Sequence, residues 1–172
     1  MIKKEELLVR IQADRQFLFE AIEGVPDEAL TIPGAVGTWS ALDVLAHITA
    51  WDGETLRRIA FATGENTHPP HDVDDEAYWL AWNEKQVEIK RLLGPRGTKV
   101  DMASTWTRLL ARIESLSPMD YARWREIDPY FFEERHDLEH ADQLHTWRKR
   151  WEQSLPWWQR AKRKWARKQR AS

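Results

Sequence analysis

Apolar residues recur at steps of three and four along most of the chain, the spacing that places them on one face of an α-helix. The first such stretch sets Leu7, Ile11, Leu18 and Ile22 among charged and amide side chains. The same periodicity predicts helices over residues 3–23, 41–62, 74–93, 100–116 and 131–154. No stretch alternates apolar and polar residues as a half-buried strand does. The pattern therefore predicts an all-α protein.

Glycine and proline separate the predicted helices. Gly24-Val25-Pro26 ends the first helix, and Gly94-Pro95-Arg96-Gly97 ends the third. Ser40 followed by Asp43 resembles a capping box, in which two side chains bind backbone amides at the start of a helix. Residues 65–73 are expected to form an exposed loop, and the chain around residues 117–130 a mixed connection.

The composition excludes several classes of protein. The 172 residues suit one domain with a packed core, and the absence of cysteine excludes disulfides, thiolate nucleophiles and cysteine-bound zinc. No run approaches the ~20 apolar residues of a membrane span, and the charged start Met1–Glu6 is unlike a signal peptide. Gly-rich phosphate loops, GxSxG and HExxH are absent from the sequence. We expect a soluble, cytoplasmic protein.

The net charge of −2 conceals two unlike parts of the chain. Residues 1–156 carry 19 basic and 28 acidic side chains, whereas residues 157–172 carry seven basic side chains and no acidic one. We therefore expect a helical domain over 1–156 and a basic C-terminal helical extension over 157–172. An amphipathic basic helix suits docking on an acidic surface of its own or a second subunit, which we favour, or binding to nucleic acid or an anionic membrane.

Two of the six histidines, His136 and His140, have the spacing of one helical turn and leave the same helix face. This spacing lets two imidazole nitrogens bind one metal ion, although a solvated pair is the alternative. The helical wheel places the pair on the stripe that continues through Gln143, Trp147 and Trp151, which favours an inward position. His145 lies off this stripe and is expected at the boundary or the surface.

His47 lies at the edge of the apolar arc of the helix predicted over 41–62, between Trp51 and the acidic residues Asp43 and Glu54. It is either a histidine that is hydrogen-bonded to an acidic neighbour or a third metal ligand at the mouth of the bundle. The residues alone do not decide between these two interpretations.

Two separate segments carry a resemblance to a known family. The first is the Trp-Ser-x-x-Asp-Val-Leu-Ala-His-Ile pattern within residues 37–51, followed by Trp51; the second is His-Asp-Leu-Glu-His at 136–140, continuing to Trp-Arg-Lys at 147–149. Together they resemble the DinB-like four-helix-bundle proteins, most closely the ClbS/DfsB family, over about residues 3–153. The resemblance implies an up-and-down bundle around one pocket, with the helix over about 74–93 as an extra segment.

In many DinB-like proteins one histidine of the second helix and two of the last helix bind a divalent metal ion. The matching residues here are His47, His136 and His140, and the ion would be Zn, Ni, Fe or Mn. Three neutral imidazoles would leave a coordination position open for water or substrate.

Further acidic residues are weaker candidates for catalysis. Asp43 could orient the His47 imidazole from one turn away. Glu54 could act as a general base, but we favour a surface acid that pairs with Arg58 at i+4. Glu133-x-x-His136 has the spacing of a di-metal site, yet such a site needs a second copy of the motif, which the helix over 41–62 lacks.

Five of the 11 tryptophans could line a flat apolar pocket, although filling the core of a long bundle explains most single rings equally well. The five are Trp51, Trp79, Trp82, Trp106 and Trp147. The ClbS-like resemblance implies hydrolytic inactivation of a small electrophilic metabolite, for self-protection. The alternatives are a thiol transferase, as in other DinB-like branches, or a non-catalytic bundle for binding or assembly. A homodimer fits the resemblance and the amphipathic tail.

Overall fold

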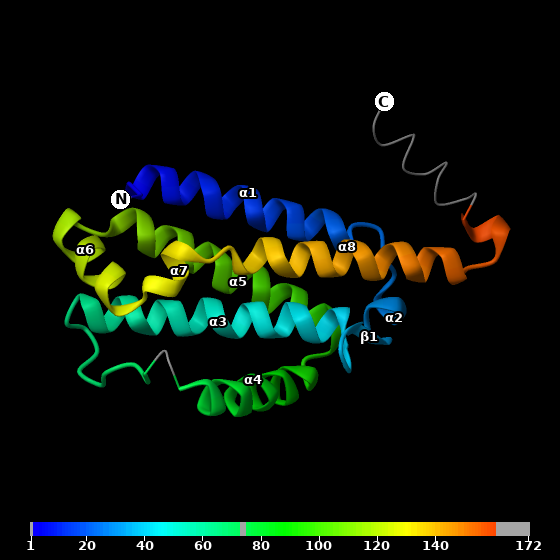
Figure 1. Cartoon of the computed structure of the whole chain (residues 1–172), viewed down its shortest axis with the longest axis horizontal. Helices are drawn as coiled ribbons and strands as arrows, with labels where there is room; N and C mark the ends of the chain where they lie inside the picture. Colours follow the sequence, from blue (N-terminus) through cyan, green and yellow to red (C-terminus); the bar gives the residue numbers. More distant parts are fainter. Residues whose placement is uncertain (1, 73–74, 161–172) are drawn as a thin grey trace.

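The computed structural model describes residues 2–72 and 75–160. Four long helices form a bundle in this part of the chain, and a fifth helix and several short elements accompany them (Figure 1). In chain order the elements are α1 (Lys4–Ile22), α2 (Asp27–Leu30), β1 (Pro33–Val36), β2 (Trp39–Ser40), α3 (Ala41–Ala62), α4 (Glu76–Arg91), α5 (Gly94–Ser115), α6 (Pro118–Ile127), α7 (Pro129–Glu133) and α8 (His136–Ser154). The all-α prediction is confirmed.

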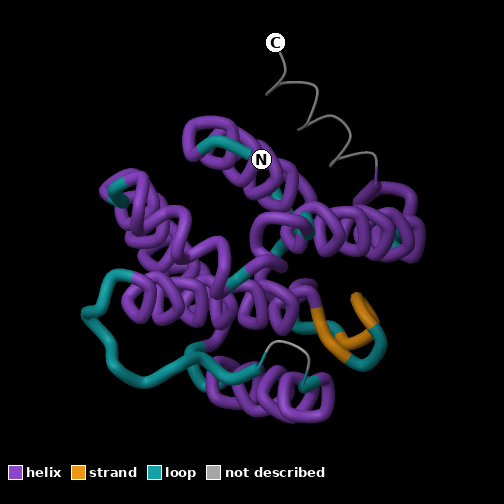
Figure 2. The backbone as a smooth tube through the Cα atoms, turned by 60° about the vertical axis from the view of Figure 1, so that its left-hand side comes forward, coloured by secondary structure: helices purple, strands orange, loops and turns teal. Residues whose placement is uncertain are grey.

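The bundle consists of α1, α3, α5 and α8, with α1 packed along α8 and α3 packed along α5. Helix α4 lies on the outside of α3, away from α1 (Figures 1 and 2). The loop after α3 and helix α4 together lead the chain back along the bundle, so α3 and α5 run in the same direction (Figure 1). The extra helical segment expected over about 74–93 is therefore part of the return between two bundle helices.

The short hairpin of β1 and β2 leads into α3 and is the one element with strand structure among the described residues (Figure 2). Its pairing joins Pro33 to Ser40 and Val36 to Trp39, which is too short for a period of two to show in the sequence. Ser40 accepts a hydrogen bond from the amide of Asp43, and the Asp43 carboxylate accepts one from the amide of Ser40. The predicted capping box is confirmed.

Helix α5 begins at Gly94, six residues before the predicted start. Gly94 has a φ of 63°, a conformation that glycine adopts without steric cost, and it turns the chain sharply after α4. Pro95 then occupies the first turn of α5, where its missing N–H is not needed. The glycine and proline run thus ends one helix and starts the next within the same few residues.

The helix predicted over 131–154 is broken into α7 and α8. Glu134 and Arg135 have non-helical ψ angles of 156° and 62°. Arg10 of α1 donates hydrogen bonds to the carbonyl oxygens of Phe131 and Phe132, at 3.1 and 2.8 Å. A continuous helix would use these carbonyls for its own ladder, so their capture by Arg10 stabilises the break.

The core consists of two apolar clusters at opposite ends of the bundle. The hairpin-end cluster joins the C-terminal half of α1 to the hairpin, the start of α3 and α8, and includes Leu18, Leu45 and Trp147. The α6-end cluster joins the N-terminal half of α1 to the end of α3, α5, α6 and α7, and is centred on the fully buried Trp124. Between them, α1 and α3 carry buried polar side chains, and these form the site described below.

The mixed connection expected around residues 117–130 contains α6 and the start of α7. Among the described residues, no helix is both long enough and apolar enough to cross a lipid bilayer. Of the predicted C-terminal extension, residues 157–160 are described, and Trp157 and Trp158 are 74% and 55% exposed. Trp165 and the remaining residues after 160 lie outside the described part of the chain. The predicted role of this extension therefore stays a prediction.

Candidate metal centre

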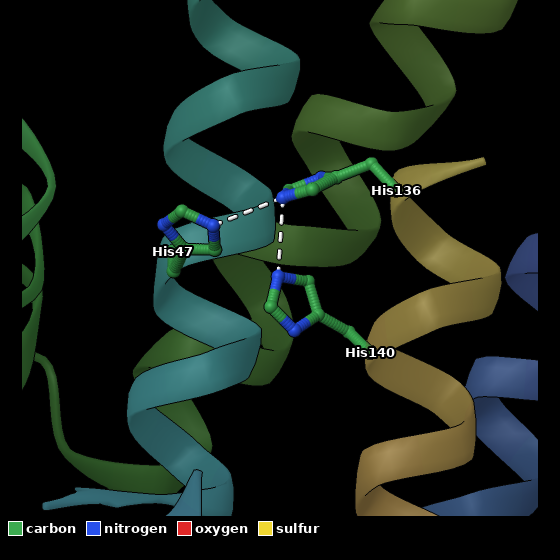
Figure 3. Close-up of side chains that lie close together, drawn as sticks. All are labelled: His47, His136 and His140. Carbon is green, nitrogen blue, oxygen red and sulfur yellow. Dashed lines mark hydrogen bonds between the residues drawn. The ribbon is translucent and has the colours of Figure 1, made fainter. Parts of the chain in front are cut away.

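The three predicted histidines converge on one point between α3 and α8 (Figure 3). The Nε2 atom of His136 lies 3.0 Å from Nε2 of His47 and 3.1 Å from Nε2 of His140. One ring nitrogen from each histidine lies within 4.8 Å of the other two. His47 and His140 are buried and His136 is partly buried. The geometry places His47 beside the other two histidines, where the three side chains could hold one metal ion.

The break between α7 and α8 sets the geometry of this cluster. His136 is the first residue of α8, and His140 follows one turn later on the same face. His47 faces them from the second turn of α3, close to the hairpin. The rings of Trp39 and Trp51 pack near the His47 ring, with ring centroids 5.0 and 6.4 Å away. These contacts contribute to the burial of His47.

Burial keeps the three imidazoles neutral near pH 7. The pKa of His47 is lowered to about 3, chiefly by burial and then by the nearby His140, while Asn83 acts weakly in the opposite direction. Burial and the two neighbouring histidines lower the pKa of His136 well below its ordinary value. The pKa of His140 is also lowered by burial. Neutral imidazole is the form that binds a metal ion.

Hydrogen bonding alone does not satisfy the three converging nitrogens. His140 Nδ1 lies 2.8 Å from Oε1 of Gln143, so it carries the proton and leaves the Nε2 lone pair facing the cluster. One proton on His136 Nε2 can serve either His140 or His47 well, but not both. His47 Nδ1 is buried without a hydrogen-bond partner among the described residues. The arrangement therefore has more lone pairs than donors at its centre.

A divalent ion fits this donor set. Metal–nitrogen bonds of about 2.1 Å place the ligand nitrogens of one ion roughly 3.0–3.4 Å apart, and two of the three contacts here are 3.0 and 3.1 Å. Within the ranges 2–72 and 75–160, these histidines are the one group of potential ligands that gathers in this way. Glu133, of the alternative di-metal motif, is exposed and lies outside the group.

A buried ionic network that sequence reasoning missed lies beside the histidines. Arg15 of α1 is 2% exposed and donates two hydrogen bonds of 2.9 Å to Asp52 of α3 and two, of 2.5 and 3.3 Å, to Asp137 of α8. Its guanidinium also stacks on Trp106 at 4.0 Å. Burial raises the pKa of Asp52 to about 6, against the opposing effect of Arg15. The network joins α1, α3 and α8 next to His136.

A cavity of about 580 Å³ adjoins the cluster, with His47 and His136 in its wall. Three of the five predicted pocket residues line it, namely Trp51, Trp79 and Trp106. Trp82 contacts Trp51 and Trp79 but borders a separate groove. Trp147 packs in the hairpin-end cluster because the apolar stripe of α8 runs on past the cavity. The expectation that these last two also line the pocket does not agree with where they lie.

The two acidic candidates serve other partners in the structure. Asp43 binds the start of α3 and accepts hydrogen bonds from Arg91 at 2.8 and 3.1 Å, so it does not orient His47. Glu54 is paired with Arg58, as we favoured, and with Arg57. It is 7% exposed, however, so the expected surface position is wrong, and it is bonded rather than free to accept a proton.

The remaining histidines lie away from the cluster. His145 is half-buried against Phe17, with ring centroids 4.4 Å apart, in agreement with a boundary position. His71 lies in the loop before α4 and contacts Asp75 at 2.8 Å. His68 is exposed in the same loop. His145 is thus a histidine of α8 that does not face the other ligands, which makes it a natural control.

The comparison with protein families agrees with this arrangement. A model of the DinB superfamily matches residues 10–146, a range that contains all three histidines, and the chain belongs to this superfamily. No curated protein and no solved structure matches the chain.

Proposed function

We propose that this chain is a metal-dependent enzyme of the ClbS/DfsB type, which inactivates a small electrophilic metabolite by adding water to it. The observation that carries the proposal is the convergence of three neutral imidazoles, short of hydrogen-bond donors, two of which lie in the wall of an aromatic cavity. A closed structural site would need a fourth protein ligand, and the cluster has three.

A divalent ion held by His47, His136 and His140 would leave a coordination position open for water and would lower the pKa of that water toward neutrality. The chain's own residues prepare this position. Gln143 fixes the tautomer of His140, and the Arg15 network holds α8 against α3. Trp51 and Trp79 provide flat apolar walls that exclude bulk water from an organic substrate.

Two sequence features support the ClbS/DfsB assignment over a thiol transferase. The segment from Trp39 to Trp51 and the motif at residues 136–140 resemble that family. The last helix also lacks the His-Arg-Gly-Gln ending that is common among the metal-dependent thiol transferases of the superfamily. We infer that water, rather than a thiol, is the second reactant.

Metal binding is the first test, on protein prepared without an affinity tag. Titration calorimetry with Zn, Ni, Fe(II) and Mn is expected to show about one ion per chain. His136→Ala is expected to abolish this binding, while His145→Ala, which removes another histidine of the same helix, leaves it intact. A wild type that binds none of these ions contradicts the proposal and supports the non-catalytic alternative.

The reaction is tested by mass spectrometry on a panel of epoxides and activated cyclopropanes, with and without added thiol. In the expected reaction a C–O bond forms to water, a ring bond breaks, and the proton passes to the ring atom that leaves. The product therefore gains one water. A thiol adduct in its place identifies the transferase, and an unchanged panel with metal-loaded protein counts against catalysis on strained rings.

A further inference from the structure

The cavity extends along one face of α3 for about three turns. His47, Trp51, Thr55 and Arg58 all line it and are spaced at i, i+4, i+8 and i+11. With a rise of 1.5 Å per residue, the backbone positions of His47 and Arg58 are about 16 Å apart along the helix axis. One end of the cavity wall thus carries the histidine cluster, and the other end carries an arginine.

Arg58 is 1% exposed, and its guanidinium is only partly engaged. Nε donates to Glu54 at 3.0 Å, and Nη1 donates to Asp128 of the α6–α7 junction at 3.4 Å. The remaining nitrogen, Nη2, is buried and has no hydrogen-bond partner in the described part of the chain. The guanidinium lies 5.3 Å from the ring of Trp79, which is part of the cavity wall. A buried donor of this kind is costly unless an acceptor joins it.

The charges around Arg58 indicate what kind of acceptor fits. Glu54 and Asp128 balance Arg58 and the adjacent Arg57, which also binds Glu54. Over its whole length the cavity wall carries six acidic side chains, Glu76 of α4 among them, and four arginines. An additional carboxylate or phosphate at Arg58 would therefore lose its hydration next to Glu54 and Asp128, in a cavity whose wall holds more acids than arginines. A carbonyl oxygen accepts the same hydrogen bond without that penalty.

We propose that Arg58 Nη2 is the recognition point for an uncharged carbonyl oxygen, of an amide or ester, in a ligand whose flat body lies against Trp79 and Trp106. If the proposed function holds, that body extends toward the histidine cluster, and the substrate class is a neutral, electrophilic amide or ester. The carbonyl subsite itself does not depend on a metal ion. It can therefore be tested in chelator-treated protein, separately from the histidines.

Three matched probes test the acceptor in the wild type: 2-naphthamide, 2-naphthoate and 2-methylnaphthalene, followed by ligand-observed NMR titration of chelator-treated protein. The amide is expected to bind about tenfold tighter than the other two, the effect of one hydrogen bond from a charged donor. Equal binding of the amide and the hydrocarbon overturns the proposal. Tighter binding of the naphthoate overturns it as well, because the subsite would then recognise anions.

Two lysine variants locate the donor. Arg58→Lys keeps a positive charge for Glu54 and Asp128 but removes Nη2, and it is expected to abolish the preference for the amide while hydrocarbon binding persists. Arg57→Lys is the matched control, since Arg57 shares Glu54 but borders the other groove. Retention of the preference by Arg58→Lys overturns the proposal. If that variant does not fold, the wild-type ranking of the three probes decides.

A metal titration that fails, together with a clear amide preference, would reject the proposed function and leave the carbonyl subsite standing. The reverse pair of results would reject the subsite alone. The two inferences are thus tested by different ligands on different ends of one cavity.

Discussion

The histidine cluster and the Arg15 network lie side by side, yet they satisfy their polar groups in opposite ways. In the network, Arg15 makes close hydrogen bonds to two carboxylates and stacks on Trp106. In the cluster, three neutral rings turn lone pairs toward one another, and His47 Nδ1 has no partner among the described residues. The network satisfies its hydrogen bonds within the chain, whereas the cluster has lone pairs that only a further group, such as a metal ion, could bind.

This difference separates stability from binding in the same buried layer. A completed ion network holds three helices in place. When one member is removed, the remaining buried charges keep their desolvation cost but lose the attraction that offset it. A cluster with unmet bonding contributes little to folding in its metal-free form, but it is prepared for a ligand. The four predictions that follow test this division, from the largest expected effect to the smallest.

Replacing Arg15 with leucine is expected to lower the free energy of unfolding by about 3–5 kcal/mol, because the buried Asp52 and the partly buried Asp137 then lack their counter-charge. Chemical denaturation followed by circular dichroism measures the change. Lys99→Leu is the control, since its pair with Asp27 is exposed and should be worth less than about 1 kcal/mol. Similar losses in the two variants would contradict a structural role for the network.

Lowering the pH should destabilise the metal-free protein through the cluster. Unfolded histidine takes up a proton below its ordinary pKa of about 6.5, whereas His47 stays neutral in the folded state down to about 3. This difference in protonation does not affect the free energy of unfolding above pH 6.5. Below pH 6.5 it lowers the free energy of unfolding by about 1.4 kcal/mol per pH unit, because only the unfolded state takes up the proton. His47→Gln should show a correspondingly shallower decrease between pH 6.5 and 5 in denaturation curves. An identical pH slope in the variant and the wild type would count against a neutral, buried His47.

Gln143→Leu is expected to weaken metal binding about tenfold, because His140 loses the acceptor that fixes its tautomer. Competition with a chromophoric chelator measures the affinity. Gln153→Leu provides the same substitution at an exposed position of α8 and should leave the affinity unchanged. A Gln143 variant with wild-type affinity would show that the tautomer is set in another way.

Asp43→Asn is expected to cost about 1 kcal/mol of stability, since the variant weakens the capping box and the contact with Arg91. Metal affinity should not change, because Asp43 serves the helix start rather than His47. A shift in metal affinity without a loss of stability would restore the role that the sequence suggested for this residue.

The sequence predicts the helices and the candidate ligands because both depend on local spacing. His136 and His140 are one turn apart, and the pattern around His47 resembles its family closely enough to supply the third histidine. The break before His136 is not local, because it depends on Arg10, which is more than a hundred residues away and binds two carbonyls of α7. No helical period in this region reveals that contact.

The buried arginines were within reach of the sequence. Arg15 falls on the apolar stripe of α1 with Ile11 and Leu18, and Arg58 falls on the inward face of α3 beside Ile59. A charged residue on such a stripe indicates a buried ion pair or a ligand site. The partners of Arg15 could not be named from the sequence, because Asp52 and Asp137 lie on other helices.

The two separate apolar clusters give this fold a particular freedom to diversify. The hairpin-end and α6-end clusters hold the bundle at its two ends. Along α1 and α3, the polar residues beside the cavity lie between the residues that belong to the two clusters. Exchanges in the cavity wall, such as at Thr55 or Trp79, need not repack either cluster. An evolving lineage can therefore alter which molecule it accepts while both ends of the scaffold keep their packing.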